Sequence, residues 1–159
     1  MMKKMIALSL ALILLGSAAL AGAPKLSDRL FACAKQALLC LSSGEYERLV
    51  TGLPYSDVAP SAREWERFAG NFSDLGDVQT EYAVAYWRGD AWSVAVPVSV
   101  PSDGGVEALV LTSGDGTCFN GYRYSTWAKV QKEYRDSDHV CWNEEYVEGD
   151  AMLMADSAD

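Results

Sequence analysis

The sequence has little positive charge and little of the chemistry that common catalytic sites use. Its 13 Lys and Arg residues stand against 22 Asp and Glu residues, which gives a formal net charge of −9. Phosphate backbones and anionic headgroups are bound through clustered Lys and Arg, so this balance argues against nucleic acid and the membrane surface as partners. There is one histidine, His139, and no G-x-S-x-G motif. A serine nucleophile with a histidine base is therefore not indicated.

Cysteine is also scarce, and its spacing is uninformative about redox or metal chemistry. Neither a CxxC pair nor the Cys/His spacing of a zinc site is present. Cys33 and Cys40 fall in one predicted helix, where roughly 10 Å along the axis would separate them, too far for a disulfide. Two cross-pairings to Cys118 and Cys141 remain, or a single Cys118–Cys141 bridge with two buried helical thiols. We favour the single bridge, because cysteine is also a common small core residue.

Long apolar runs are absent except at the N-terminus. Two lysines precede an apolar stretch, residues 5–15, and small residues follow it, which is typical of a secretory signal peptide. Candidate cleavage sites end at Ala21 and Ala23, but the second would leave Pro24 directly after the cut, so we expect removal of residues 1–21. A retained anchor is the alternative, although the run is shorter than the roughly 20 residues that a spanning helix needs. We expect a secreted or periplasmic protein, in which disulfides are permissible.

Helical periodicity dominates the first half of the remaining chain. Residues 26–41 carry apolar side chains at i, i+3 and i+4 spacing, which predicts a long amphipathic helix. The phrase GEYERLV predicts a short second helix, and SAREWERFAGNF predicts a third, in which Ser61 and Glu64 have capping-box spacing. The third helix also carries an aromatic stripe that indicates core packing: Trp65, Phe68 and Phe72.

After Asp77 the apolar period changes from about 3.6 to 2, which predicts strands. Gly- and Asp-rich turns separate four segments, so we expect an antiparallel meander: VQTEYAVAYWRG, AWSVAVPVSV, VEALVLTS and TCFNGYRYS. Pro97 cannot donate to a ladder and therefore marks an edge or a bulge. TWAKVQKEY is predicted to be helical and HVCWNEEYV to form a fifth strand. We expect one α+β domain over residues 22–150 and a flexible tail over 151–159.

The tripeptide Arg88-Gly89-Asp90 connects the first two predicted strands. Many animal adhesion proteins present this tripeptide to integrins, and that role is one interpretation. The other is a turn, because glycine supplies the positive φ that a tight hairpin demands. The flanking strands favour the turn, and integrin recognition would require a host context that the sequence does not provide.

The order of three helices followed by a meander resembles the nuclear-transport-factor-2-like superfamily, in which helices close a cone of curved sheet. LSSGEYERLV resembles a helix junction of its small extracytoplasmic members, and VEALVLTSGDGTCFNGYRYS resembles their final hairpin. The resemblance covers about residues 27–125, and the segment from Trp127 onward is not part of it. It implies N-terminal helices packed on a curved antiparallel sheet, with a ligand site inside the cone.

Enzymes of this superfamily use a carboxylate or histidine base inside the cone, opposite a tyrosine or a second acid. Glu81 and Glu107 have the opposite parity to the bulky strand residues and are expected to face water, and His139 is expected in a loop. We therefore assign no catalytic residue, no metal site and no cofactor. The expected ligand-binding residues are aromatic: Trp65, Tyr82, Tyr86, Trp92, Tyr122 and Tyr124.

These observations predict an exported, non-enzymatic module that binds a small apolar ligand or a protein partner in its cone or on its sheet. One alternative is a small isomerase or hydrolase with its site in the cone. Another is a secreted inhibitor or envelope-interaction protein, for which the Cys-bearing C-terminal segment is the best feature. If Arg88 or Arg123 faces the cone, the ligand is expected to be anionic. A homodimer could form through a face of small residues: Ser93, Ala95 and Ser99.

Overall fold

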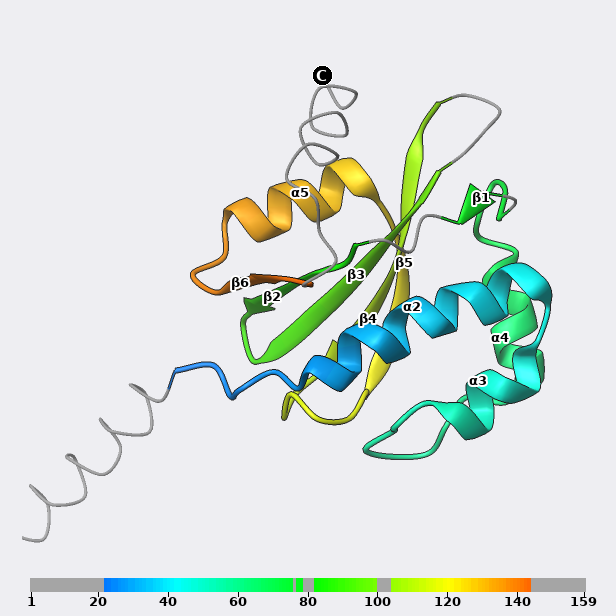
Figure 1. Cartoon of the computed structure of the whole chain (residues 1–159), viewed down its shortest axis with the longest axis horizontal. Helices are drawn as coiled ribbons and strands as arrows, with labels where there is room; N and C mark the ends of the chain where they lie inside the picture. The colour runs from blue at the N-terminus through cyan, green and yellow to red at the C-terminus, as the bar shows by residue number, and fades with distance from the viewer. Residues whose placement is uncertain (1–21, 76, 79–81, 100–103, 144–159) are drawn as a thin grey trace, which may run out of the picture.

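The computed structural model describes residues 22–75, 77–78, 82–99 and 104–143, which form an antiparallel sheet with helices on both faces (Figure 1). The predicted α+β class and the four-stranded meander are confirmed. The predicted signal peptide and tail lie outside the described residues. In chain order the elements are α2 (Asp28–Ser43), α3 (Tyr46–Gly52), α4 (Ala62–Ala69), β1 (Asp77–Val78), β2 (Val84–Arg88), β3 (Ala91–Ser99), β4 (Val106–Ser113), β5 (Gly121–Thr126), α5 (Trp127–Arg135) and β6 (Val140–Trp142).

Local signals fix the ends of the helices. Gly44 ends α2 with a left-handed φ of 74°, which glycine adopts without steric cost. At the start of α4 the predicted capping box is confirmed: Ser61 Oγ accepts a hydrogen bond from Glu64 N, and Glu64 Oε2 accepts one from Ser61 N. No helix in the described ranges is long and apolar enough to cross a bilayer.

The sheet has the strand order β5-β4-β3-β2-β6, and every pairing is antiparallel. The nine-residue β3 is its central strand. It pairs with β2 over Ala91 to Ala95 and with the short β1 at Val98 and Ser99. Pro97 therefore stands where the neighbouring strand changes from β2 to β1. Pro97 lies on the central strand and pairs with Ala108 in a continuous register with β4, so it marks neither an edge strand nor a bulge in that ladder.

The register of β2 on β3 places large side chains opposite small ones, except that Trp87 pairs with Trp92 near the turn. Tyr86 pairs with Ser93 on one face of the sheet, and Val94 pairs with Ala85 on the other. Tyr86 of β2 and Val94 of β3 consequently point to opposite faces, whereas Trp87 of β2 shares the face of Trp92. We call these the α2 face, which α2, α3 and α4 cover, and the α5 face, which α5 covers.

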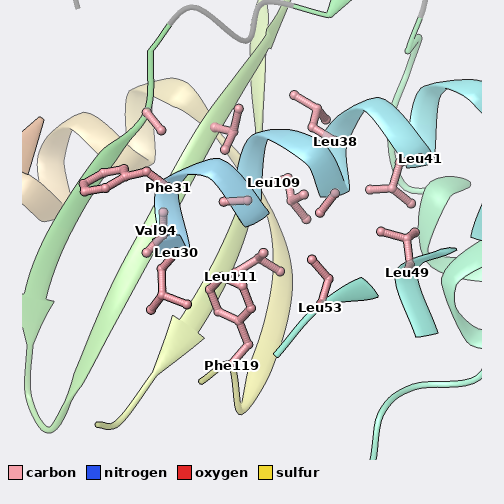
Figure 2. Packing of buried hydrophobic residues seen from close by; sticks show 14 of the residues in the cluster. Leu30, Phe31, Leu38, Leu41, Leu49, Leu53, Val94, Leu109, Leu111 and Phe119 are labelled. Atoms are coloured by element: carbon pink, nitrogen blue, oxygen red, sulfur yellow. The ribbon is translucent and has the colours of Figure 1, made fainter. Parts of the chain in front are cut away.

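The larger part of the core lies between α2 and the sheet. Figure 2 shows Leu30 and Leu38 of α2 in one cluster with Leu109 and Leu111 of β4 and with Leu49 of α3. All five side chains are at most 1% exposed. Burying a leucine of this kind contributes roughly 1.5–3 kcal/mol, so this layer supplies much of the stability of the domain.

The α5 face is buried as well. Trp127 and Val130 of α5 pack against strand residues that include Tyr86 and Val110. Ser93 and Ala95 lie under this layer, 8% and 0% exposed. The chain itself therefore covers Ser93 and Ala95 of the surface suggested for a homodimer, whereas Ser99 is half-buried.

The residues before α2 are held against the ends of two hairpins. Trp92 Nε1 donates a hydrogen bond of 2.8 Å to the carbonyl oxygen of Pro24, and Ser27 N donates one of 2.8 Å to the carbonyl oxygen of Gly116. Gly116 has a φ of +79°, and a Cβ added there would lie 2.4 Å from the carbonyl oxygen of Lys25. Only glycine fits at this crossing of the two segments.

Replacing Gly116 with alanine should lower the free energy of unfolding by about 3 kcal/mol or more, because it adds a clash with backbone to a strained φ. Gly44→Ala is the matched control, since Gly44 has a similar φ of +74° but nothing within 4 Å of an added Cβ. It should cost only about 1 kcal/mol. Urea denaturation measures both, and equal losses would contradict the predicted contact.

Candidate functional site

The structure divides the predicted ligand-binding residues between the two faces of the sheet. Tyr82 and Tyr86 belong to the cluster under α5, and Trp65 and Trp92 belong to the cluster under α2. The register of β2 on β3 is the cause, since it turns Tyr86 of β2 and Trp92 of β3 to opposite faces. These aromatic residues do not line one common cavity.

The aromatic residues on the α2 face are packed against one another. The Trp65 ring lies 4.3 Å from the Tyr122 ring, and the Phe68 ring lies 4.7 Å from Tyr122. Phe72 meets the Tyr124 ring edge-on at 5.2 Å. The predicted role of the α4 stripe in core packing is confirmed, because all three of its aromatic residues are at most 9% exposed. This face is filled by side chains where the sequence suggested an open cone.

Glu107 is a buried carboxylate, so the expectation that it faces water is wrong. It is 6% exposed and accepts hydrogen bonds from Ser73 N at 3.0 Å, Ser73 Oγ at 2.7 Å and Tyr124 Oη at 2.8 Å. Its parity is that of Leu109 on β4, which faces α2. The carboxylate ties the chain after α4 to the sheet. Glu81 lies outside the described residues.

A second buried carboxylate, Glu133, binds the two arginines of the strands. Its Oε2 accepts hydrogen bonds of 2.6 Å from Tyr86 Oη and 2.6 Å from Arg123, and its Oε1 lies 3.2 Å from Arg88. The anion that these arginines meet is therefore part of the chain. Glu133 was not among the predicted site residues, although two basic residues in the strands of an acidic protein were a signal for a buried acid.

The Arg88-Gly89-Asp90 tripeptide is a turn, as predicted. Gly89 has a φ of 69°, and the turn joins β2 to β3. Arg88 forms an ion pair with Glu133, in which Nη1 of Arg88 lies 3.2 Å from Oε1 of Glu133. The turn therefore explains the glycine of the tripeptide, and the ion pair explains its arginine.

Neither buried carboxylate is arranged as an open proton acceptor. Burial raises the pKa of Tyr86, and its hydrogen bond to Glu133 acts in the same direction. Burial alone would raise the pKa of Glu133, but the hydrogen bonds from Tyr86 and Arg123 outweigh it, so this pKa lies below its ordinary value. Glu133 is thus charged and fully bonded at neutral pH. His139 is exposed in the loop before β6, and its carbonyl oxygen accepts from Trp87 N.

All four cysteines are free thiols, and the expected Cys118–Cys141 bridge is not formed. Cys118 lies in the loop before β5, and Cys141 lies on β6. These strands are opposite edges of the sheet, and four strand spacings separate them by roughly 19 Å. A disulfide needs its Cα atoms within about 7 Å. Within the described residues no group of three or more His, Cys, Asp or Glu side chains could hold a metal ion.

A groove of about 440 Å³ lies between α2 and α3, which we call the α2–α3 groove. Its α2 wall is a stripe at i, i+3, i+4 spacing, as expected for one face of a helix. The floor is apolar and the rim carries two arginines. The lining residues are Arg29, Ala32, Cys33, Gln36, Ala37, Cys40, Arg48, Leu49, Gly52 and Leu53.

Small residues keep the α2–α3 groove open. Ala37 and Cys40 of α2 are buried, as are Leu49 and Leu53 on the other wall. Gly52 has no side chain, and a Cβ added there would meet nothing within 4 Å. The small-residue stripe of α2 was the sequence signal for this groove, but a helix face of alanine and cysteine is usually read as core.

The polar groups of the α2–α3 groove are neutral or basic. Burial raises the pKa of the Cys33 thiol, although the neighbouring Arg29 acts against this shift, so the thiol is neutral at pH 7. Gln36 Nε2 donates to Cys40 Sγ at 3.6 Å. Arg48 makes an exposed ion pair of 3.0 Å with Glu45, which does not line the groove. Within the described part of the chain, no carboxylate belongs to the lining.

Comparisons with known proteins return no relative of this chain. No protein-family model matches it, and no curated protein or solved structure matches it either. The α2–α3 groove is accordingly interpreted from its own residues and geometry.

The bonded carboxylate of Glu133 makes the stability of the domain depend on pH. Because its folded pKa is lowered, Glu133 stabilises the fold above its unfolded pKa of about 4.3, and this contribution is lost as the pH falls through the folded value. Glu133→Gln should lower the free energy of unfolding by about 2 kcal/mol at pH 7. The difference from wild type should shrink below about pH 4.

Glu66→Gln is the matched control, because Glu66 is exposed on α4; it should change stability by less than about 0.5 kcal/mol. Denaturant titrations between pH 3 and pH 7 compare the three proteins. A pH-independent difference between Glu133→Gln and wild type would contradict the charged role of Glu133.

Proposed function

We propose that the protein is a non-enzymatic binding module that holds a small, largely apolar anion in the α2–α3 groove. The observation that carries the proposal is the lining itself. Its floor is apolar, and both of its charged residues, Arg29 and Arg48, are basic in a chain of net charge −9. An apolar floor favours a hydrocarbon body, and guanidinium groups favour a carboxylate or another anionic head.

The size of the groove suits an elongated small molecule. Its volume of about 440 Å³ lies within the roughly 300–1,000 Å³ typical of ligand sites. The lining residues of α2 run from Arg29 to Cys40, which corresponds to about 16 Å along the helix. A medium-length alkyl chain can lie along this stripe with its head group at either arginine.

The arginines are available to a ligand. Arg29 is exposed beside Cys33, and the Arg48–Glu45 pair is exposed on both sides, with side chains 61% and 47% accessible. An exposed pair of this kind contributes little, so a ligand carboxylate can replace Glu45 at small cost. The negative charge of the rest of the surface makes binding of an anion depend on these two residues.

A non-enzymatic role is supported by the state of the two buried carboxylates. Glu107 and Glu133 each accept a tyrosine hydroxyl and further donors. A general base must have a lone pair within reach of the substrate proton. Neither residue lines the α2–α3 groove.

We further propose that the domain belongs to the nuclear-transport-factor-2-like superfamily and that it is exported. The order of three helices before a four-stranded meander supports the first proposal, as does α2 lying across one face of the sheet. The layer of α5 and β6 on the other face is an addition to that pattern. The N-terminal sequence supports export to the periplasm or the cell exterior.

Calorimetry with decanoate tests the proposed ligand class. Arg29→Gln/Arg48→Gln should weaken decanoate binding at least about tenfold, since charge-assisted bonds are lost, and should leave binding of uncharged decanol unchanged. Gly52→Leu should abolish binding of both, because Gly52 lines the groove and a Cβ added there meets nothing within 4 Å, which leaves space for a side chain to occupy. Leu39→Trp is the matched control, as Leu39 is 40% exposed on α2 outside the lining. Unchanged binding to the Gly52→Leu variant would contradict the proposal.

Thiol labelling locates the ligand without a mutation. Bound decanoate should slow the reaction of Cys33 with a maleimide, because Cys33 is half-buried in the groove. Cys141 is exposed on β6 and serves as the internal control, whose rate should not change. Peptide mass spectrometry resolves the two sites, and equal protection of both cysteines would indicate an effect on the whole fold.

A further inference from the structure

A second cavity, of about 320 Å³, lies between the segment after α3 and the start of β5. Three aromatic residues and two carboxylates belong to its lining: Tyr55, Phe119, Tyr122, Asp57 and Glu64. We call it the aromatic cavity. It shares no lining residue with the α2–α3 groove.

Backbone hydrogen bonds hold one wall of the aromatic cavity. Phe119 N donates to the carbonyl oxygen of Pro54 at 2.7 Å, and Ser56 N donates to the carbonyl oxygen of Phe119 at 3.0 Å. Tyr55, between these two positions, donates its hydroxyl to the carbonyl oxygen of Leu49. Burial raises the pKa of Tyr55 to about 12, so this wall is neutral at physiological pH.

Aromatic packing holds the opposite wall. One side of the Tyr122 ring is stacked at 4.3 Å on Trp65, which is fully buried. The Phe68 ring contacts Tyr122 edge-on at 4.7 Å. Tyr55 and Tyr122 are both half-buried, and their position on two fixed walls makes the aromatic cavity preformed.

The charge of the aromatic cavity is negative. The backbone hydrogen bond from Ser61 lowers the pKa of Glu64, so its carboxylate is ionised at neutral pH. Asp57 Oδ1 accepts only from Val58 N, at 2.8 Å, among the described residues. Both backbone N–H groups of the capping box, Glu64 N and Ser61 N, already donate hydrogen bonds within the box at the start of α4. These donors therefore cannot bind an anion.

Among the residues that the structure describes, no lysine or arginine lines the aromatic cavity. Two basic residues adjoin lining residues in sequence, Arg63 beside Glu64 and Arg123 beside Tyr122, and Arg123 is paired with Glu133. Arg67 lies one turn beyond Glu64 on α4. Burial and the charge of Glu64 raise the pKa of Tyr122, and Arg67 acts in the opposite direction. Arg67 is therefore close enough to influence the site without belonging to it.

We propose that the aromatic cavity is a binding site for a small organic cation of the quaternary ammonium type. Aromatic rings attract such a cation through their quadrupole, and its methyl groups favour apolar surroundings. Asp57 and Glu64 add the opposite charge, and the net charge of −9 raises the local concentration of cations. Val58, 90% exposed in the lining, offers an apolar contact at the rim.

Titration of the intact protein with choline, followed by NMR, tests this site. The chemical shifts of the ring protons of Tyr55 and Tyr122 should change as choline is added, and the change should saturate. The carbon isostere of choline, in which a tert-butyl group replaces the trimethylammonium group, should bind at least about tenfold more weakly. Equal affinity for the two compounds would overturn the proposal, and so would the absence of saturable binding.

Isosteric variants separate the site from the general charge of the protein. Asp57→Asn/Glu64→Gln keeps the hydrogen-bond acceptors and the cap and should weaken choline binding about tenfold. Glu47→Gln/Glu66→Gln removes the same charge from exposed positions outside the lining. This double variant should change the affinity for choline less than about twofold. Arg67→Gln should tighten binding. Equal losses in the two double variants would overturn the proposal, because they would indicate only general attraction of cations.

The Gly52→Leu variant keeps this test independent of the α2–α3 groove. It blocks that groove and should leave choline binding unchanged. Loss of choline binding in Gly52→Leu, with the melting temperature retained, would overturn the assignment of the cation to the aromatic cavity.

Discussion

The register of β2 on β3 is the constraint on which the rest of the structure depends. It places Tyr86 opposite Ser93 and Val94 opposite Ala85, so on each face a large side chain of one strand lies beside a small one of the other, except where Trp87 meets Trp92. Each face then presents a ridged apolar surface that must be covered. Helices α2, α3 and α4 cover one face, and α5 covers the other (Figure 1). A slip by one residue would exchange the two sets and unpack both layers.

Covering both faces leaves little room for chemistry inside the sheet. The two carboxylates that do lie there are bonded within the chain: Glu107 to Ser73 and Tyr124, and Glu133 to Tyr86 and Arg123. Leaving any of these groups unpaired would cost more than a typical hydrogen bond contributes. Open surfaces with defined chemistry occur instead where helices and loops meet, at the α2–α3 groove and at the aromatic cavity. Opposite charges in their linings suit them to different ligands.

Local features of the fold could be predicted from the sequence, because short-range physics sets them. The capping box at Ser61, the helix end at Gly44 and the turn at Gly89 each depend on neighbouring residues only. Features that depend on how distant segments meet could not. Cys118 and Cys141 are separated because β6 adds to the edge of β2, and Glu107 is buried because its parity is that of the α2 face. The predicted aromatic set failed as one site for the same reason, since parity within a strand does not give its register on the next.

Intermolecular NOEs to bound decanoate would test the central claim, that the ligand site lies in the helical layer and not within the sheet. NOEs from the alkyl chain to the methyl groups of Ala32, Ala37 and Leu49 are predicted, because these residues line the α2–α3 groove. NOEs to the strand residues Val94, Leu109 or Val110, or to none of the labelled methyl groups, would contradict the account.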